Sequence, residues 1–215
     1  MLRSAYRRLA LGLAIALAIA GSPHAEVRPA PGSGAAPQPS AFAVGLDAYD
    51  RGDYAEALRA WRPLAAQGDA DAQFNLGFMY YKGQGVAQDY VEAVRWYRLA
   101  AAQGVARAQA SLGLMYYKGQ GVAQDYAEAV RWYRLAAAQG DAVAQFNLGV
   151  MYYNGEGVAQ DYVEAHKWYN LSGANSPDKA TRDLAVKNRD IVASKMTAAQ
   201  IAEAQRLARV WKPTK

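Results

Sequence analysis

The chain has 215 residues, of which 52% are hydrophobic, and it contains no cysteine. Without cysteine it cannot form disulfides, covalent haem attachments or thiolate metal sites. The formal net charge is +5, but three arginines at the extreme N-terminus contribute much of it, and the rest of the chain carries only about +2. So small an excess of basic groups argues against nucleic acid as a partner.

The first 25 residues are typical of a secretory signal peptide. Three arginines precede an apolar run from Leu9 to Ala20. This run is shorter than the ~20 residues that a membrane-spanning helix needs, so a permanent membrane anchor is the less favoured alternative. We place cleavage after Ala25, with cleavage after Ala20 as the alternative. The mature protein is therefore expected to be exported, and to be either periplasmic or secreted.

Residues 26–40 follow with the sequence EVRPAPGSGAAPQPS. Pro, Gly, Ser and Ala dominate this stretch, and it has no apolar periodicity. Such a composition predicts a flexible linker between the signal peptide and the first helix.

One sequence then recurs three times. NLGFMYYKGQGVAQDY begins at Asn75, SLGLMYYKGQGVAQDY at Ser111 and NLGVMYYNGEGVAQDY at Asn147, a constant step of 36 residues. The step defines full repeats at 70–105, 106–141 and 142–177. A shorter copy at 41–69 has a tight turn where the full copies have a glycine-rich loop. Self-similarity at this period indicates a repeat array.

Each copy is predicted to be a helical hairpin. In the first full copy, apolar residues recur at three- and four-residue spacing over Ala70–Tyr81 and again over Asp89–Gln103. The intervening GxG sequence follows no strand and precedes no Lys-Ser/Thr pair, so we interpret it as a turn and not as a phosphate-binding loop. A lone hairpin cannot bury its apolar face, whereas stacked hairpins share one core.

The stretch AQFNLGFMYYKGQGVAQDYVEAVRWYRLAAAQG resembles the Sel1-like repeat, a relative of the tetratricopeptide repeat with a longer turn. The resemblance extends from Ala70 to about Ala174, and residues 41–69 resemble the shorter, tetratricopeptide-like unit. It implies an all-α fold, a right-handed α-α superhelix of helical hairpins. It also implies a non-catalytic adaptor that works in the assembly of complexes.

The C-terminal part, 178–215, is predicted to form two helices that cap the last repeat. Ser176-Pro177-Asp178 is a favourable helix start, and Thr197 with Gln200 forms a capping box before the final helix. Near the other end of the array, Pro63 falls within the second helix of the short copy, where we expect a kink or a late helix start.

The predicted core stripes lie on both helices of a hairpin. Leu76, Gly77 and Tyr80 share one side of the first helix, and small residues around Tyr97 share one side of the second. Four tryptophans recur beside this seam, and we assign them packing roles. They are Trp61, Trp96, Trp132 and Trp168.

A second stripe on the first helix is the candidate partner site. Phe74, Phe78 and Tyr81 are spaced i, i+4 and i+7, with Lys82 beside them. By resemblance this stripe lines the concave surface, where related proteins hold peptides or partner helices. The corresponding residues of the later copies are Ala110, Leu114, Tyr117 and Lys118, then Phe146, Val150, Tyr153 and Asn154.

The first two full copies differ at only six of 36 positions, and four of the six lie on the first helix. One of these four places Arg107 where the preceding copy has Asp71. The pattern favours a surface that is read by a partner, although drift at exposed positions explains it as well. We expect Lys82, Arg107 and Lys118 to select acidic residues of that partner.

A catalytic or metal site is hard to assemble from the remaining residues. After removal of the signal peptide His166 is the only histidine, and it occupies the position of Val94 and Val130, so we interpret it as a packing residue. The recurring Asp89, Asp125 and Asp161 are typical of helix N-caps, and Glu92 is placed for a surface ion pair with Arg95. No cofactor is expected.

The sequence therefore predicts a non-catalytic interaction scaffold of the bacterial cell envelope, which binds a segment of another envelope protein in its groove. A peptidoglycan or glycan binder that stacks sugar rings on tyrosines is the alternative, and a cell-wall enzyme is the least favoured class. Nucleic acid is not expected as a partner, and the oligomeric state is left open.

Overall fold

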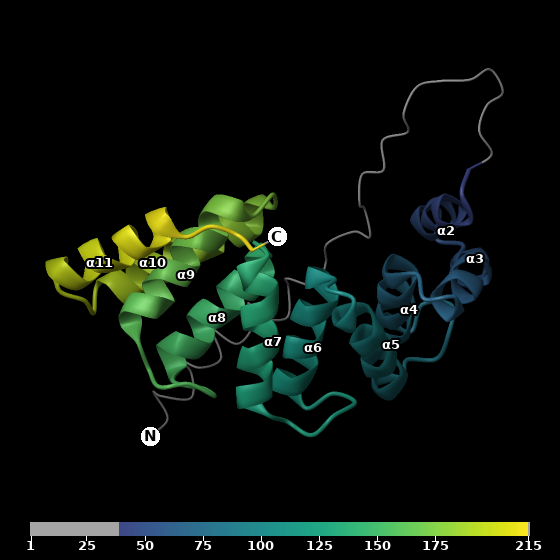
Figure 1. Cartoon of the computed structure of the whole chain (residues 1–215), viewed down its shortest axis with the longest axis horizontal. Helices are drawn as coiled ribbons and strands as arrows, with labels where there is room; N and C mark the ends of the chain where they lie inside the picture. Colours follow the sequence, from purple (N-terminus) through teal and green to yellow (C-terminus); the bar gives the residue numbers. More distant parts are fainter. Residues whose placement is uncertain (1–38, 215) are drawn as a thin grey trace, which may run out of the picture. The chain divides into compact units, whose positions relative to one another are not determined.

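The computed structural model describes residues 39–214, and every regular element in that range is an α-helix (Figure 1). This confirms the all-α class and the helical hairpins. The predicted signal peptide and nearly all of the predicted linker lie outside the described residues. The described chain divides into two compact units, 39–105 and 106–214, which we call the N-terminal and C-terminal units.

The N-terminal unit contains four helices, each packed against the next along the chain. They are α2 (Ala41–Asp50), α3 (Tyr54–Ala66), α4 (Ala70–Lys82) and α5 (Tyr90–Ala102). Trp61 is fully buried at the centre of the first hairpin, and its Nε1 donates to the carbonyl oxygen of Phe42 at 3.2 Å. The packing role expected for this tryptophan is thereby confirmed.

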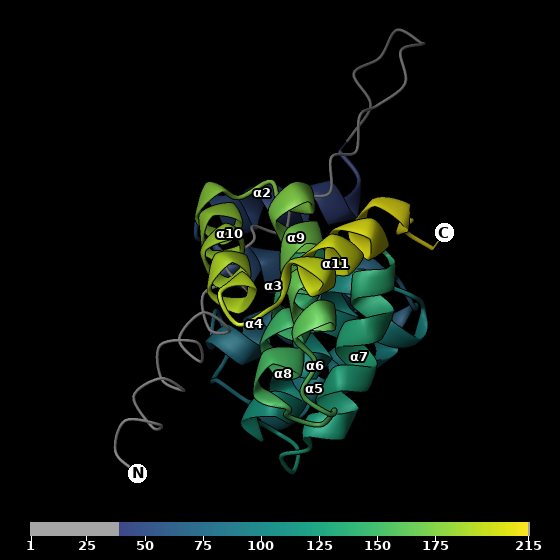
Figure 2. The same ribbon diagram turned by 90° about the vertical axis from the view of Figure 1, so that its left-hand side faces the viewer.

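The C-terminal unit contains six helices. They are α6 (Ala106–Lys118), α7 (Tyr126–Ala138), α8 (Ala142–Asn154), α9 (Tyr162–Asn175), α10 (Lys179–Ala193) and α11 (Ala198–Val210). The hairpins α6–α7 and α8–α9 pack on each other through α7 and α8, and both α10 and α11 pack on α9 (Figure 2). The two last helices therefore cover the face of the final hairpin that no further repeat covers.

Close approach of the two helices within a hairpin depends on a glycine. A Cβ atom built on Gly77, Gly113 or Gly149 would lie 2.6–2.8 Å from ring carbons of Tyr97, Tyr133 or Tyr169, respectively. All three tyrosine rings are fully buried. The predicted core stripe around Leu76 and Tyr97 is confirmed, except that Tyr80 is only half-buried.

Amide side chains hold the other end of each hairpin together. Gln103 donates to Gln73 at 2.8 Å, Gln139 to Gln109 at 2.9 Å, and Asn175 to Gln145 at 3.0 Å. Gln145 also donates to the carbonyl oxygen of Ala137 on the preceding hairpin, at 3.2 Å. In each pair a buried amide on the first helix accepts from an exposed amide after or at the end of the second helix, and Gln73 makes the same bond to the preceding hairpin, to the carbonyl oxygen of Ala65 at 3.1 Å.

The local signals at helix ends are borne out with one exception. Asp89, Asp125 and Asp161 each accept two backbone N–H bonds as N-caps, and both hydrogen bonds of the Thr197–Gln200 capping box are present. The late start expected at Pro63 is wrong, because α3 begins at Tyr54 and continues to Ala66. Pro63 lies in the last turn and is exposed, so water can bond to the carbonyl group that proline leaves without a donor.

Candidate functional site

The predicted partner stripe is largely part of the core. Six of its members are between 0% and 8% exposed: Phe74, Phe78, Ala110, Leu114, Phe146 and Val150. The ring of Phe74 lies 5.8 Å from that of Tyr97, the ring of Phe78 lies 6.3 Å from that of Tyr49, and the ring of Phe146 lies 5.3 Å from that of Tyr169. The expectation that these six side chains form an open surface is corrected.

The physical reason is that the first helix of a stacked hairpin has more than one neighbour. Helix α4 packs on α3 as well as on α5, and α8 packs on α7 as well as on α9. Two apolar stripes on one helix are therefore both covered. The prediction of partner binding now rests on the more accessible members of the stripe and on Arg107, which was predicted beside it. The accessible members are Tyr81, Lys82, Tyr117, Lys118, Tyr153 and Asn154.

Most of these accessible residues gather at the C-terminal ends of the first helices. Lys82, Lys118 and Asn154 are the last residues of α4, α6 and α8. Arg107 instead lies in the first turn of α6, about 15 Å along the helix from Tyr117, at 1.5 Å per residue. Arg107 therefore lies at the opposite end of α6 from Tyr117 and Lys118.

A pair of tyrosines recurs where the two helices of a hairpin meet the connecting turn. The first member ends the first helix, and the second member begins the second helix. Ring centroids lie 5.3 Å apart for Tyr49–Tyr54, 5.6 Å for Tyr81–Tyr90, 5.2 Å for Tyr117–Tyr126 and 5.7 Å for Tyr153–Tyr162. We call these the tyrosine pairs. All eight rings are half-buried.

Sequence reasoning found the first member of three pairs and missed every second member. The missed residues include Tyr90, Tyr126 and Tyr162, each of which follows an N-cap aspartate. The recurring Asp-Tyr dipeptide was the available signal, but periodicity alone does not show that two rings on different helices meet. Their contact is a property of the hairpin geometry.

In the N-terminal unit, the loop of one repeat closes the tyrosine pair of the repeat before it. Gln84 lies between the two glycines of the GxG sequence. Its Oε1 accepts from the Tyr49 hydroxyl at 2.8 Å, and its Nε2 donates to the Tyr54 hydroxyl at 2.9 Å. The amide thus uses both of its polar atoms on one pair of rings.

In the C-terminal unit, a carboxylate takes the place of this amide. Glu156 stands where the other loops have Gln84 and Gln120, and its Oε2 accepts from the Tyr117 hydroxyl at 3.2 Å and from Asn154 at 3.3 Å. Burial and the negative charge of Glu156 together raise the pKa of Tyr117. Two predicted site residues, Tyr117 and Asn154, therefore bind the same carboxylate.

The last tyrosine pair is flanked by a cation. Lys195 follows α10, and its Nζ lies 5.7 Å from the ring centroid of Tyr153 and 5.9 Å from that of Tyr162. Lys82 in the N-terminal unit has a similar relation, with its Nζ 5.8 Å from the ring of Tyr81. A lysine ammonium beside an aromatic ring attracts acidic groups while the ring offers apolar area.

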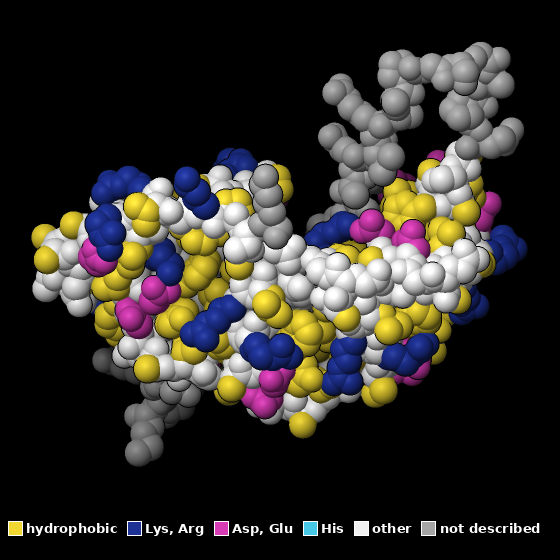
Figure 3. All heavy atoms as spheres, viewed as in Figure 1, with side chains coloured by type: hydrophobic (Ala, Val, Ile, Leu, Met, Phe, Trp, Pro, Cys, Tyr) yellow, Lys and Arg dark blue, Asp and Glu magenta, His cyan; other side chains and the backbone are white. Residues whose placement is uncertain are grey.

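The second helices carry a different surface with mixed charge. Arg95 stacks at 4.2 Å on the ring of Trp96 and pairs with Glu92 at 2.9 Å, and Arg131 repeats both contacts. These exposed ion pairs confirm the expected surface pairing. Over the C-terminal unit, basic, acidic and hydrophobic side chains are interspersed (Figure 3). Trp96 and Trp132 are half-buried beneath their arginines, and Trp168 is buried.

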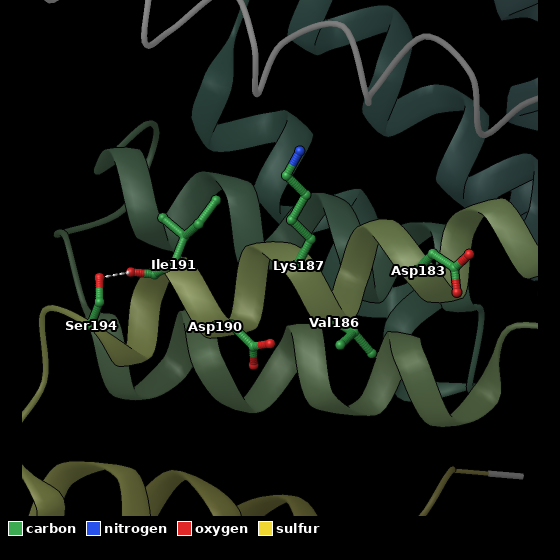
Figure 4. Close-up of a pocket in the computed structure, with 6 residues that line it drawn as sticks. All are labelled: Asp183, Val186, Lys187, Asp190, Ile191 and Ser194. Carbon is green, nitrogen blue, oxygen red and sulfur yellow. Dashed lines mark hydrogen bonds between the residues drawn. The ribbon is translucent and has the colours of Figure 1, made fainter.

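A hollow of about 640 Å³ runs along α10. All the described residues that line it belong to α10 or, in the case of Ser194, to its C-cap. Figure 4 shows Lys187 and Ile191 on one side with Asp190 and Val186 on the other. Val186 and Ile191 are 40% and 39% exposed. The hydroxyl group of Ser194 donates to the carbonyl oxygen of Ile191, which leaves it bonded to its own helix. The hollow brings no nucleophile together with a base.

His166 is buried, as expected for a packing residue, although its side chain is polar. It faces a second hollow, where α9, α10 and α11 meet. Burial, together with the charge of Arg189, lowers the pKa of its imidazole. Within residues 39–214, no three His, Asp or Glu side chains are grouped as metal ligands would be. No helix in the described chain is long and apolar enough to cross a bilayer.

Comparison with known proteins identifies the repeats. The family model described as Sel1 repeat matches residues 70–105, 106–141 and 142–176. The solved structure of a Sel1 repeat protein from Oxalobacter formigenes is 32% identical, with a TM-score of 0.59, and the match covers 76% of this chain and 72% of that one. No curated protein matches the chain.

A second solved structure is that of c5321, a protective antigen present in uropathogenic Escherichia coli strains, which displays an SLR fold. It is 31% identical with a TM-score of 0.56, and the match covers 80% of this chain but only 44% of c5321. The chain therefore spans less than half of that protein. With a helical hairpin in each matched repeat, a glycine–tyrosine seam in each hairpin and these two likenesses, the chain belongs to the Sel1 repeat family.

Proposed function

We propose that this protein is an exported, non-catalytic scaffold that binds a segment of another protein on its tyrosine pairs and the lysines beside them. Sel1 repeat proteins generally act as protein-interaction scaffolds, and the fold is typically non-catalytic. The observation that carries the proposal is the tyrosine pair, which recurs at the same position in four hairpins.

The chemistry of this surface favours a segment that mixes acidic and apolar residues. Half-buried tyrosine rings offer large contact area with little loss of side-chain entropy, which is why aromatic residues anchor many interfaces. Lys82 and Lys118 end the helices that carry Tyr81 and Tyr117. An acidic side chain of the partner can reach such an ammonium group while its neighbours cover the rings.

Export to the cell envelope is proposed from the sequence alone. The arginines and the apolar run of the first 25 residues are typical of a signal peptide. Mass spectrometry of the protein from fractionated cells tests this directly. A periplasmic or secreted chain that begins at residue 26 or 21 supports export, and an intact N-terminus in the cytoplasmic fraction contradicts it.

The binding proposal is tested by crosslinking and co-purification from envelope fractions. The test variant is Lys82→Glu with Lys118→Glu, which reverses two charges beside the tyrosine pairs. The control variant is Arg59→Glu with Arg62→Glu, because both arginines are exposed on α3, five and eight residues after Tyr54. A protein captured by wild type and control but lost from the test variant supports the proposal.

A protein captured equally by all three forms places the interface elsewhere on the chain and contradicts the proposed site. Sugar rings also stack on tyrosine, so glycan binding on the same pairs is the second candidate function. Retention of purified chain on peptidoglycan, reduced by Tyr153→Ala, would support that role. Turnover of a cell-wall substrate that persists through stringent purification would contradict a non-catalytic function.

A further inference from the structure

A polar hollow lies where α9, α10 and α11 meet at the end of the C-terminal unit. Its volume is about 430 Å³, within the range of about 300–1,000 Å³ typical of small-molecule pockets. Its polar lining combines two arginines, one aspartate, one histidine and two amides from these three helices. They are His166 and Asn170 on α9, Arg189 and Asp190 on α10, and Gln205 and Arg209 on α11.

The most unusual member of this lining is His166. Its side chain replaces the valine of the two preceding repeats and is only 3% exposed. Its Nδ1 makes no hydrogen bond with any described residue. Buried polar atoms are normally hydrogen-bonded, because an unbonded one has lost its water without compensation. The lining of the hollow thus includes a buried imidazole whose hydrogen-bonding capacity the described chain does not use.

The charged groups of the hollow favour an anion. Arg189 donates to Asp190 at 3.0 Å and 2.8 Å, and to Asn170 at 3.5 Å, so α10 supplies a partly neutralised cation. Arg209 is exposed and forms no hydrogen bond or ion pair with the rest of the described chain. Its planar guanidinium can therefore offer two parallel N–H groups to a carboxylate.

The charge balance indicates the type of anion. Two arginines and one aspartate leave about one positive charge, because burial and Arg189 lower the pKa of His166 and keep its imidazole neutral at pH 7. A single negative charge is matched, and Asp190 would repel a second one. Ala193 and Ile201 complete the lining with apolar surface for a short carbon chain.

We propose that this hollow binds one carboxylate group, with Arg209 as the main cationic partner and the imidazole of His166 as a hydrogen-bond donor. The carboxylate comes from a small organic acid or from the C-terminus of a peptide. This site is separate from the tyrosine pairs, so it stands or falls independently of the proposed scaffold surface.

The test is a titration of the full mature chain with acetate, with a short peptide that lacks acidic side chains, and with the C-terminal amide of that peptide. Calorimetry gives the affinity, and the NMR signals of the His166 imidazole report occupancy. The test variants are Arg209→Gln and His166→Val. The matched control is Arg206→Gln, because Arg206 lies on the same helix, is exposed and pairs with Glu203.

Acetate is expected to shift the His166 signals saturably and to raise the pKa of the imidazole. Arg209→Gln should weaken binding at least tenfold, and Arg206→Gln should leave it unchanged. His166→Val should also weaken binding. It should retain the thermal unfolding profile, because valine occupies this position in two other repeats. Binding of the free peptide but not of its amide identifies a C-terminal carboxylate, and binding of acetate without either peptide identifies a small acid.

Three results would overturn the proposal. The first is the absence of a saturable shift with acetate and with the free peptide. The second is equal affinity of the Arg209 and Arg206 variants. The third is tighter binding of inorganic phosphate than of acetate, because the hollow would then favour a dianion against the charge balance described above.

Discussion

Gly157 lies directly on the main chain of Tyr126. A Cβ atom on this glycine would be 2.3 Å from the carbonyl oxygen of Tyr126, and the glycine has a positive φ of 69°. Gly157 is the second glycine of a GxG loop, and Tyr126 begins the second helix of the preceding hairpin. A Cβ atom on Gly85 would lie 2.8 Å from the Cβ atom of Tyr54 and 3.0 Å from its carbonyl oxygen. The absence of a side chain at the second glycine of the loop therefore allows the loop to pack directly against the preceding hairpin.

Replacement of Gly157 by alanine is expected to destabilise the protein by about 2–4 kcal/mol, because the methyl group meets backbone and the positive φ disfavours a side chain. Urea denaturation followed by circular dichroism measures the change. Gly68→Ala is the matched control. Gly68 also has a positive φ, of 97°, but a Cβ atom added there would meet no atom within 4 Å, so only about 1–2 kcal/mol of strain is expected. Equal losses would show that conformational strain alone explains both.

Gln145 is expected to contribute to the stability of the interface between repeats. It is 0% exposed, donates to Ala137 and accepts from Asn175. Gln145→Leu keeps the bulk but removes both hydrogen bonds. The carbonyl oxygen of Ala137 still accepts from the Gly140 N–H and Asn175 is exposed, so a loss of about 1–2 kcal/mol is expected, at about 0.5–1.5 kcal/mol per hydrogen bond. Gln67→Leu, at an exposed helix C-cap, should change stability by under about 0.5 kcal/mol. A comparable loss at both positions would contradict the role of Gln145.

Tyr117 should make the protein sensitive to alkaline pH. Its folded-state pKa is raised above the ordinary value of 10.0, first by burial and then by Glu156. Above pH 10 the unfolded chain releases the phenolic proton while the folded chain keeps it, so the free energy of unfolding falls as pH rises. Tyr117→Phe should show a shallower fall between pH 9 and about pH 11 in urea titrations.

Glu156→Gln provides a second measurement at this site. It restores the residue found in the other two loops and removes the nearby negative charge. The pKa of Tyr117 should therefore fall, and difference absorbance of the phenolate should show one tyrosine that titrates earlier than in the wild type. An unchanged titration would show that the Tyr117–Glu156 contact has no electrostatic effect in solution.

The ion pair of the last full repeat is expected to contribute more to the free energy of unfolding than the equivalent ion pair of the first full repeat. Glu164 pairs with Lys167, whose side chain is 13% exposed, and also accepts from Trp168 Nε1 at 2.9 Å. Glu92 pairs with Arg95, which is 54% exposed. Glu164→Ala should cost about 1–2 kcal/mol and Glu92→Ala about 0.5 kcal/mol or less, as measured by chemical denaturation. The reverse order would contradict this assignment.

Local structure and family membership could be predicted from the sequence because both depend on neighbours along the chain. Helical periodicity, the aspartate N-caps and the Thr197–Gln200 capping box act within three or four residues, and the 36-residue step is visible by inspection. The glycine–tyrosine seam also followed from small residues opposite large ones, because both helices of a hairpin belong to one short segment.

Only the tertiary structure decided which of the predicted surfaces remain accessible. The sequence shows that Phe78 and Phe146 lie on an apolar stripe, but whether they are buried depends on the helices packed beside them. Likewise, Gln84 and Tyr49 are distant in sequence, and so are His166 and Arg209. Periodicity shows that a helix face is apolar, whereas the element that covers it is determined by packing between segments, and that packing leaves the tyrosine pairs and the polar hollow as the candidate binding sites.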